Sequence, residues 1–133
     1  MNTAKISGCI ITYNEERNIR RCIESLIPIC EEIVVIDSFS TDGTIQICKE
    51  LGVKVFQHPF IGHIEQKSFA LSKCLHDWVI SLDADECLTP TLQVSIQNTE
   101  LKEEKIAFEV SRLTNFSGQW IRHSGWYPDK KTR

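Results

Sequence analysis

A segment near the middle of the chain combines an apolar run with a cluster of acids. The run occupies residues 78–82, and Asp83, Asp85 and Glu86 follow it. A nearly continuous apolar run is typical of a parallel strand buried on both faces under helices. Ligands bind at the carboxyl edge of an open α/β sheet, which is where these acids fall. Because alternate residues of an extended segment point the same way, we expect Asp83 and Asp85 to converge on one object.

Two interpretations of this acidic cluster remain open from spacing alone. Like charges placed close together repel unless a cation or hydrogen-bond donors lie between them. Carboxylate oxygens suit Mg²⁺ or Mn²⁺, which proteins commonly hold with one or two carboxylates and the phosphates of a substrate. The alternative is a solvated acidic turn that ends the strand.

The rest of the chain alternates between strand-like and helix-like segments. We expect strands at residues 6–13, 31–37, 53–57, 78–83 and 106–110. We expect helices at residues 15–27, 44–51, 64–75 and 90–98, a charged turn at 100–105, and loop with short extended pieces from 112. Strands separated by helices of this length predict a mainly parallel sheet with flanking helices, an α/β fold.

Several residues mark the expected ends of the helices. Asn14 is expected to cap the first helix, with Glu15 and Glu16 in its first turn. Gly52 is expected just past the end of the second helix. The pair Thr89–Pro90 is a strong start signal for the fourth helix.

Composition narrows the class of protein. The chain has 133 residues, enough for one modest domain, and a net charge of −3 argues against a nucleic-acid partner. No Cys-x-x-Cys pair or zinc-finger spacing occurs, so we expect buried thiols in a reducing cytosol. No signal peptide or membrane-spanning stretch is recognisable, which predicts a cytoplasmic protein. The cysteines concerned are Cys9, Cys22, Cys30, Cys48, Cys74 and Cys87.

Three polar segments are expected at the same edge of the sheet, namely residues 12–15, 37–38 and 83–86. No Gly-x-Gly-x-x-Gly follows the first strand and no P-loop is present, which excludes those phosphate-binding turns. An acidic-site α/β signalling domain of the receiver type stays possible, although the spacing of Asp83 and Asp85 is unusual for it.

The combination of motifs resembles family 2 glycosyltransferases of the GT-A fold. The motifs are Ile-Thr-Tyr-Asn-Glu at 11–15, Val-Ile-Asp-Ser-Phe-Ser-Thr-Asp-Gly-Thr at 35–44 and Leu-Asp-Ala-Asp-Glu at 82–86. Gln-Lys-Ser-Phe-Ala-Leu at 66–71 and Gly-Trp-Tyr-Pro-Asp at 125–129 are closer to the lipopolysaccharide-core β-glucosyltransferase group. The resemblance implies a single nucleotide-sugar-binding domain over residues 1–133, with the donor-binding half at 1–100 and the start of the acceptor-side region at 101–133.

The resemblance also implies roles for individual residues. It implies that Asp37 accepts a hydrogen bond from the uracil or ribose and that Lys67 lies near the base or diphosphate. Asp83 would face the ribose and the metal, and Asp85 would be the main ligand of a divalent ion, Mg²⁺ or Mn²⁺. The remaining implied nucleotide-sugar contacts are Thr12, Tyr13, Asn14, Glu15 and Ala84. The sequence also leaves structural roles open for these residues, such as a turn, a helix cap or a solvated side chain.

The implied reaction is inverting transfer of a sugar, glucose, from a UDP-sugar to a lipopolysaccharide-core or related glycan or glycolipid acceptor. Ser38 replaces a second acid that often follows the equivalent of Asp37. The family's enzymes continue beyond the equivalent of Asp129 and usually supply the general base there, so a nucleotide-binding remnant or regulatory module without turnover is the alternative. Peripheral association with the inner membrane surface and homo-oligomerisation are further expectations.

Overall fold

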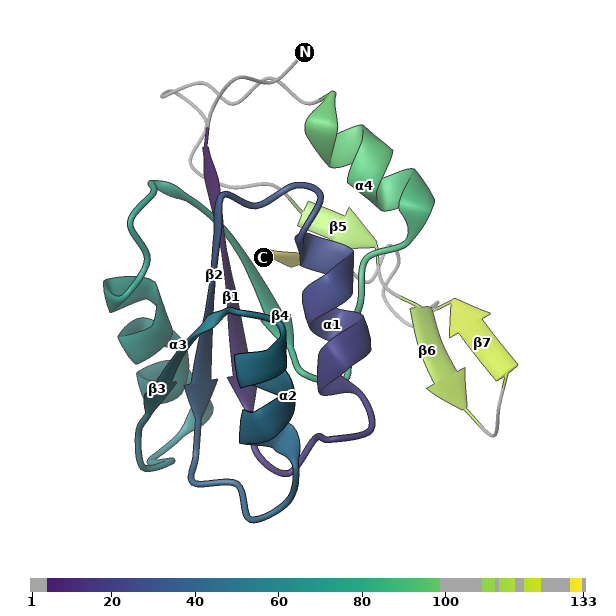
Figure 1. Cartoon of the computed structure of the whole chain (residues 1–133). Coiled ribbons are helices and arrows are strands. Elements are labelled where there is room, and N and C mark those ends of the chain that lie inside the picture. The colour runs from purple at the N-terminus through teal and green to yellow at the C-terminus, as the bar shows by residue number, and fades with distance from the viewer. Residues whose placement is uncertain (1–4, 99–108, 112, 117–118, 123–129, 133) are drawn as a thin grey trace. The chain divides into compact units, whose positions relative to one another are not determined.

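The protein forms two compact units, Met1–Leu101 and Lys102–Arg133. The computed structural model describes residues 5–98, 109–111, 113–116, 119–122 and 130–132 (Figure 1). The boundary lies beside the division expected at residue 100, but the donor and acceptor roles of the two parts stay predictions. Each unit is described below by itself.

The first unit is built on a four-stranded parallel sheet with the order β3-β2-β1-β4 (Figure 1). The strands are β1 (Ile6–Thr12), β2 (Glu32–Asp37), β3 (Lys54–Gln57) and β4 (Trp78–Asp83). The helices are α1 (Ile19–Leu26), α2 (Thr44–Glu50), α3 (His63–Ser72) and α4 (Pro90–Gln97). The prediction of a mainly parallel α/β sheet is therefore confirmed.

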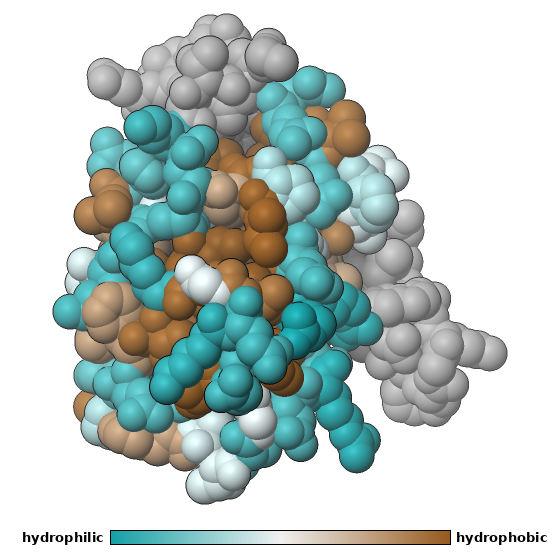
Figure 2. Space-filling view, in the orientation of Figure 1, coloured by the Kyte–Doolittle hydropathy of each residue, from teal (hydrophilic) through white to brown (hydrophobic). Residues whose placement is uncertain are grey.

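Helices cover both faces of this sheet. Ile10 of β1 and Val35 of β2 pack with buried residues of α1 and α2 in one apolar cluster. Cys9 of β1 and Ile36 of β2 pack with Ala70 of α3 in a second cluster on the other face. Hydrophobic residues gather in the middle of the face that carries α1 and α2, within a hydrophilic surround (Figure 2). The alternating directions of side chains along β1 and β2 thus supply two cores.

The strand order reverses direction at β1. The chain moves outward from β1 to β2 and β3, then returns through α3 to β4 on the other side of β1. In open α/β sheets, ligands bind beyond the carboxyl ends of the strands at such a reversal. The ends of β1 and β4, at Thr12 and Asp83, therefore flank the favoured place for a site.

Two of the predicted helix signals are confirmed. Gly52 follows α2 with a φ of 73°, a left-handed conformation that glycine adopts without steric cost. The Thr89 hydroxyl accepts a hydrogen bond from Leu92 N at 3.1 Å, and Pro90 is the first residue of α4. These caps fix where α2 ends and α4 begins.

The predicted start of the first helix is wrong. Helix α1 begins at Ile19 with Asn18 at the N-cap position, and its first turn holds no acid. Asn14 does not cap it, because Asn14 adopts a φ of 50° and directs its side-chain oxygen to another loop. Glu15 and Glu16 precede the helix rather than forming its first turn. The predicted helix at 64–75 is also corrected to His63–Ser72.

Strand β4 is less buried than its apolar sequence predicts. It lies at the edge of the described four-stranded sheet, and Leu82 is its one buried residue. Burial on both faces, as expected for Trp78 to Leu82, is therefore wrong for most of the strand. The interior strands β1 and β2 show that pattern instead.

The described residues of the second unit form two antiparallel strand pairs. Strand β5 (Glu109–Ser111) pairs with β8 (Lys130–Thr132), and β6 (Leu113–Phe116) pairs with β7 (Gln119–Arg122). The strand predicted at 106–110 is observed from Glu109, while 106–108 and the turn predicted at 100–105 lie outside the described residues. Residues 125–129, with the motif that includes Trp126 and Asp129, also lie outside them.

The cysteines and hydropathy give two further observations. All six cysteines are free thiols; Cys9, Cys22 and Cys48 are buried, and the other three are half-buried. The prediction of buried thiols is thus confirmed for the first three and is wrong in degree for Cys30, Cys74 and Cys87. Within the described residues, no helix has the length and apolar character needed to cross a membrane.

Candidate functional site

Three adjacent strands of the sheet end in polar residues. Thr12 of β1 is in register with Asp37 of β2, and Ile11 of β1 is in register with Asp83 of β4. The Ser38 amide donates to the Thr12 carbonyl at 3.0 Å, and the Ala84 amide donates to the Ile11 carbonyl at 3.2 Å. The parallel sheet therefore brings the three predicted segments together at one edge.

The loops that follow β1 and β2 are joined by hydrogen bonds between side chains and backbone. The Asn14 side-chain oxygen accepts from Thr41 N at 2.7 Å and from Asp42 N at 3.3 Å. The Asn14 amide in turn donates to the Ser40 hydroxyl at 2.8 Å. The left-handed conformation of Asn14, which asparagine tolerates better than most residues, makes these contacts possible.

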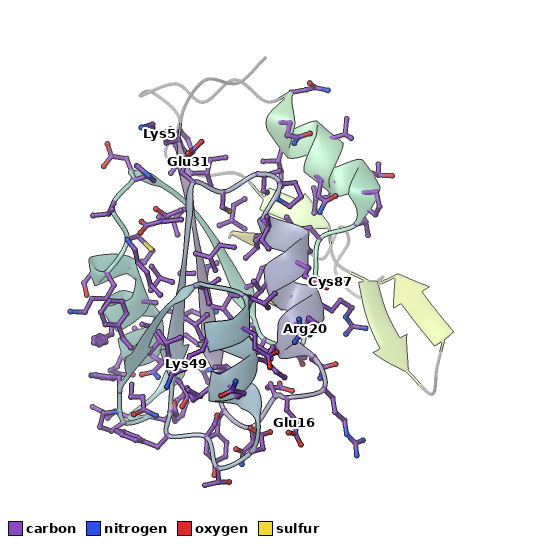
Figure 3. All side chains as sticks on the ribbon, in the orientation of Figure 1. Lys5, Glu16, Arg20, Glu31, Lys49 and Cys87 are labelled. Atoms are coloured by element: carbon purple, nitrogen blue, oxygen red, sulfur yellow. The ribbon has the colours of Figure 1, made fainter. Side chains whose placement is uncertain are left out.

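A second set of bonds joins the same two loops beside α1 and α2. The Glu16 amide donates to an Asp42 carboxylate oxygen at 3.2 Å, and the Gly43 amide donates to the Glu16 carboxylate at 2.9 Å. Slight burial would raise the pKa of Asp42, but bonds from Thr44 and Glu16 outweigh it and hold that pKa below its usual value. Glu16 lies at this edge, whereas Lys5 and Glu31 lie at the opposite edge (Figure 3).

Asp37 is buried and holds the loop that follows β2. Its side chain accepts from the Ser40 amide at 2.8 Å, the Ser40 hydroxyl at 2.5 Å and the Gln57 amide group at 3.4 Å. The residue is 0% exposed. Contact between Asp37 and a nucleotide stays a prediction, and the geometry assigns this carboxylate a local role in shaping the loop.

Asp83 has an unpaired carboxylate oxygen. Its Oδ1 is buried and has no hydrogen-bond partner among the described residues, and the same holds for Thr12 Oγ1 at the end of the neighbouring strand. Buried polar atoms are almost always hydrogen-bonded, so each exception calls for an explanation. A ligand or cation that binds at this edge would supply partners for both atoms.

The segment after Asp83 is a tight turn rather than an extended strand. The Glu86 amide donates to the Asp83 carbonyl at 2.9 Å, and a Glu86 carboxylate oxygen accepts from the Asp83 amide at 2.9 Å. The predicted alternation that would aim Asp83 and Asp85 in one direction is therefore wrong. Asp85 is exposed in the turn. The distance between Asp85 and a cation held by Asp83 therefore depends on the conformation of this turn and not on the alternating side-chain directions of a strand.

The acidic turn makes this edge electronegative. Burial, reinforced by the negative charges of Glu86, Asp85 and Asp83, raises the pKa of the Cys22 thiol well above its usual range. No group of three or more His, Cys, Asp or Glu residues that would hold a metal occurs in the part of the chain that the structure describes. A divalent cation at Asp83 and Asp85 would therefore need further oxygen ligands, which the phosphates of a substrate can supply.

The other predicted contacts occupy different environments. Tyr13 is 57% exposed, and Glu15 is half-buried, with its amide donating to the Thr44 hydroxyl at 2.9 Å. Ala84 is buried beside the acidic turn. Tyr13 is thus open to a ligand at the edge, while Glu15 and Ala84 join neighbouring segments.

Lys67 lies on α3, half-buried, and no ion pair of its ammonium group is found among the described residues. The pKa of Cys9 is lowered mainly by a hydrogen bond with Cys74, against burial, with smaller contributions from Ser81 and the positive charge of Lys67. Lys67 is therefore close enough to the α3 face of β1 to act on Cys9. An unpaired cation there suits an anionic ligand.

Sequence reasoning missed a polar connection between α3 and the site. Gln66, which is 1% exposed, donates to the Ser38 hydroxyl at 2.9 Å. Its side-chain oxygen contacts His58 Nδ1 at 3.0 Å. The signal was a glutamine four residues before the buried Ala70, hence on the helix face that packs against the sheet.

Comparison with known proteins identifies the family. A model of glycosyl transferase family 2 matches residues 7–131. The chain belongs to glycosyltransferase family 2. An uncharacterised glycosyltransferase of Rickettsia typhi is 43% identical over 117 residues, covering 86% of this chain and 40% of that protein. The lipopolysaccharide core biosynthesis glycosyltransferase LpsC of Rhizobium meliloti is 42% identical over 93 residues, covering 66% of this chain and 34% of that protein.

Solved structures of this glycosyltransferase class share the fold. The glucosyl-3-phosphoglycerate synthase of Mycobacterium tuberculosis, in complex with Mn²⁺, UDP and glucosyl-3-phosphoglycerate, superposes with a TM-score of 0.55. It is 28% identical, over 62% of this chain and 34% of that one. TarS of S. aureus has a TM-score of 0.59 and 28% identity, over 70% of this chain and 31% of that one. The GT-A architecture predicted from sequence is thereby confirmed.

The chain spans about 40% of the length of the R. typhi relative. The matches to LpsC and to the synthase cover 34% of each of those proteins. The family match at residues 7–131 includes the carboxyl ends of β1, β2 and β4. Family membership therefore rests on the region that carries the candidate site.

Proposed function

We propose that this family 2 glycosyltransferase chain binds a UDP-sugar, UDP-glucose, with a divalent metal ion at the carboxyl edge of β1 and β4. The observation that carries the proposal is a pair of buried atoms there, Asp83 Oδ1 and Thr12 Oγ1, for which the described part of the chain supplies no hydrogen-bond partner. The M. tuberculosis synthase, which shares the fold, is known with Mn²⁺ and UDP. The position of the two atoms at the strand-order reversal agrees with a nucleotide site.

The residues present suit Mg²⁺ or Mn²⁺ in part. Asp83 and Asp85 offer hard oxygen ligands, and the diphosphate of the donor completes the set in this proposal. When bound, the ion neutralises the charge of the leaving diphosphate as the bond from the sugar breaks. Lys67 adds positive charge toward the same anion. Tyr13, with 57% of its surface exposed, is proposed to contact the nucleoside.

We propose inverting transfer of the sugar to a lipopolysaccharide-core or related glycan or glycolipid. The similarity to LpsC of R. meliloti supports this acceptor class. Inverting transfer needs a general base for the acceptor hydroxyl, a role that we assign to none of the described residues. A cytoplasmic location, peripheral association with the inner membrane surface and self-association remain predictions.

Thermal unfolding with UDP, UDP-glucose and GDP, each with and without Mn²⁺, tests the donor site. Ligand at a hundred times its dissociation constant adds about 2.7 kcal/mol of stability, which raises the midpoint by several degrees. We expect this rise with uridine nucleotides and Mn²⁺, and its loss in Asp85→Ala. Asp77→Ala is the matched control, because Asp77 is an exposed carboxylate just before β4, away from this edge.

An unchanged shift in Asp85→Ala would show that the metal assignment is wrong. Absence of any nucleotide shift in the wild-type chain would overturn the donor site. Transfer of glucose from UDP-glucose to a core oligosaccharide distinguishes an enzyme from a nucleotide-binding module without turnover.

A further inference from the structure

The loop after β2 holds two serines whose hydroxyl groups are used differently. Ser40 donates its hydroxyl proton to Asp37 at 2.5 Å and accepts from Asn14 N at 2.8 Å. Ser38 accepts from Gln66 Nε2 at 2.9 Å, and no acceptor for its own proton occurs among the described residues. A serine hydroxyl has one donor and two acceptor positions, so Ser38 retains a donor.

The neighbouring Asp37 is poorly placed to contact a ligand. It is 0% exposed, and both of its carboxylate oxygens already accept hydrogen bonds from Ser40 or Gln57. Ser38 is half-buried, and its amide is bonded to the carbonyl of Thr12 at the end of β1. Ser38 therefore presents a free donor on the α3 face of the sheet, next to the end of β1.

Gln66 requires an explanation of its own. A glutamine that is 1% exposed loses side-chain entropy and hydration, so an apolar residue of similar size would fill the space at lower cost. Its main partners, the Ser38 hydroxyl and His58 Nδ1, belong to half-buried residues that water can reach. Packing and burial thus do not account for the amide, whereas orientation of Ser38 does.

The Gln66 amide is itself held in one orientation. Its oxygen contacts His58 Nδ1 at 3.0 Å, and its nitrogen also approaches the His58 carbonyl at 3.4 Å. The His58 ring packs against Phe69, with 4.0 Å between centroids. With Nε2 directed at Ser38, the proton of the Ser38 hydroxyl must point away from Gln66.

We propose that Gln66 is a positioning residue that fixes the Ser38 hydroxyl as a hydrogen-bond donor to an oxygen of the nucleoside part of the sugar donor. This inference rests on the proposed nucleotide-sugar function. An ionised acid in place of Ser38 could only accept hydrogen bonds at neutral pH. A serine held by Gln66 instead donates a hydrogen bond from this position.

The test is a double-mutant cycle on the dissociation constant of UDP with Mn²⁺, measured by calorimetry. Ser38→Ala removes the hydroxyl, and Gln66→Met removes the amide at similar volume. We expect Ser38→Ala to weaken UDP binding roughly 3- to 10-fold, the effect of one neutral hydrogen bond. Gln66→Met should weaken it by a similar or smaller factor, and should have no further effect in the Ser38→Ala background.

Four further measurements separate positioning from a general structural effect and identify the acceptor. Ser38→Thr keeps a hydroxyl and should retain most of the affinity. Inorganic diphosphate with Mn²⁺ carries no nucleoside, so neither substitution should change its binding. With 2′-deoxy-UDP, a vanished Ser38→Ala effect identifies the 2′ oxygen as the acceptor, and a retained effect identifies another oxygen of the nucleoside. The unfolding midpoint without ligand should change little in Ser38→Ala.

Three results would overturn the inference. If wild-type protein binds UDP in an Asp85-dependent manner but Ser38→Ala and Gln66→Met bind it equally well, the positioning role is wrong and the proposed function stands. Additive effects of the two substitutions would likewise reject the coupling. If the wild-type chain binds no nucleotide, both proposals fail together.

Discussion

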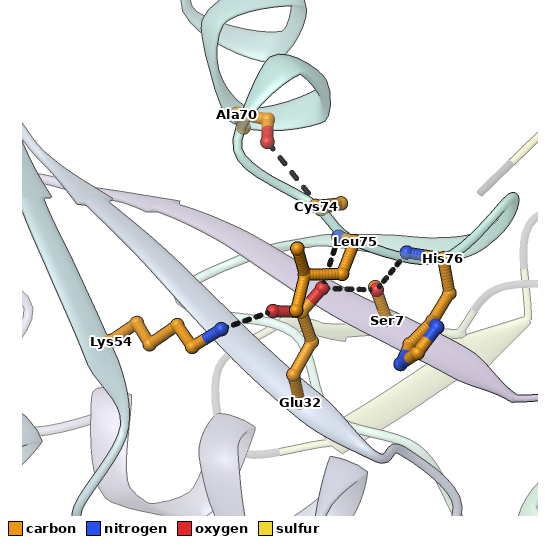
Figure 4. A network of polar contacts seen from close by, with 7 residues as sticks. All are labelled: Ser7, Glu32, Lys54, Ala70, Cys74, Leu75 and His76. Carbon is orange, nitrogen blue, oxygen red and sulfur yellow. Dashed lines mark hydrogen bonds and ion pairs between the residues drawn. The ribbon is translucent and has the colours of Figure 1, made fainter.

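The two edges of the parallel sheet each hold a carboxylate and a hydroxyl group, and the edges differ in whether the oxygen atoms of these groups are hydrogen-bonded. At the amino edge, Glu32 accepts from Ser7 at 2.5 Å, from Lys54 at 2.8 Å and from the Leu75 amide, and Ser7 accepts from His76 N at 3.2 Å (Figure 4). At the carboxyl edge, Asp83 and Thr12 each keep a buried oxygen that no described residue bonds. A satisfied cluster stabilises the fold, and an unsatisfied one leaves capacity for a ligand.

The electrostatics of Glu32 follow from this network. Burial alone would raise the pKa of Glu32, but hydrogen bonds from the Leu75 amide, Lys54 and Ser7, with the charge of Lys54, outweigh it and lower the pKa from 4.5 to about 2. The bonds tie together β1, β2, β3 and the segment between α3 and β4. Glu32 therefore links three of the four strands, and the segment that leads into β4, at the amino edge of the described sheet.

The largest effect is expected for Glu32→Gln. The substitution keeps the shape but removes the charge that three donors bind, so we expect a loss of roughly 1.5–3 kcal/mol in the free energy of unfolding. Chemical denaturation at neutral pH measures it. Glu31→Gln, at an exposed neighbouring position, is the control and should stay within about 0.5 kcal/mol.

The stability difference between wild type and Glu32→Gln should also depend on pH. Because the folded pKa of Glu32 lies below the unfolded value of 4.5, its contribution is present above pH 4.5 and is lost as the pH falls toward about 2. The difference in stability between wild type and Glu32→Gln should shrink over that range. A difference that stays constant down to pH 2 would contradict the network as the cause.

A smaller effect is expected at the loop junction on the carboxyl edge. Asn14→Ala removes the bonds to Thr41 and Asp42. It also leaves an alanine at a φ of 50°, where no side-chain hydrogen bond offsets the cost of the left-handed conformation. We expect a loss of about 2 kcal/mol from the lost bonds and the left-handed conformation together. Asn14→Gly, which tolerates this φ, should lose less, and thermal or chemical unfolding compares them.

Asn18→Ala is the matched control for this pair. Asn18 precedes α1 with a φ of −116° and makes no side-chain capping bond; its side chain bonds only Glu15 and Arg21, three residues away on either side, so its replacement should cost less than that of Asn14. Equal losses in Asn14→Ala and Asn14→Gly would mean that the left-handed conformation is not enforced in solution.

Sequence patterns predicted the fold where a local rule determines the outcome. The apolar runs of β1 and β2 identified the interior strands, and Thr89–Pro90 and Gly52 marked helix ends because caps depend on neighbouring residues. The prediction failed at Asn14, where a partner 27 residues away outweighs a local cap. The contact between Gln66 and Ser38 spans 28 residues and has no local signature.

The candidate site was predictable in its location but not in its geometry. Acids at strand ends placed Asp37 and Asp83 at one edge, because parallel strands end together. The sequence did not reveal that Asp37 would be enclosed by Ser40 and Gln57, or that Asp85 would lie in a turn. Those outcomes depend on which side chains the loops bring together, and the pleat of a strand does not determine them.

The smallest change in stability is expected at Asp83, and it tests the comparison of the two edges most directly. Asp83→Asn removes a charge from a carboxylate with one oxygen that finds no partner in the described ranges, next to the negative charges of Asp85 and Glu86. Relief of this repulsion should leave the free energy of unfolding within about 0.5 kcal/mol of wild type, or raise it, while Mn²⁺-dependent UDP binding is lost. Glu32→Gln, a charge removal of the same kind, should do the reverse, lowering stability and sparing UDP affinity. If Asp83→Asn destabilised the ligand-free protein as much as Glu32→Gln does, the unpaired oxygen would have a structural partner, and the carboxyl edge would be a second satisfied cluster rather than a binding site.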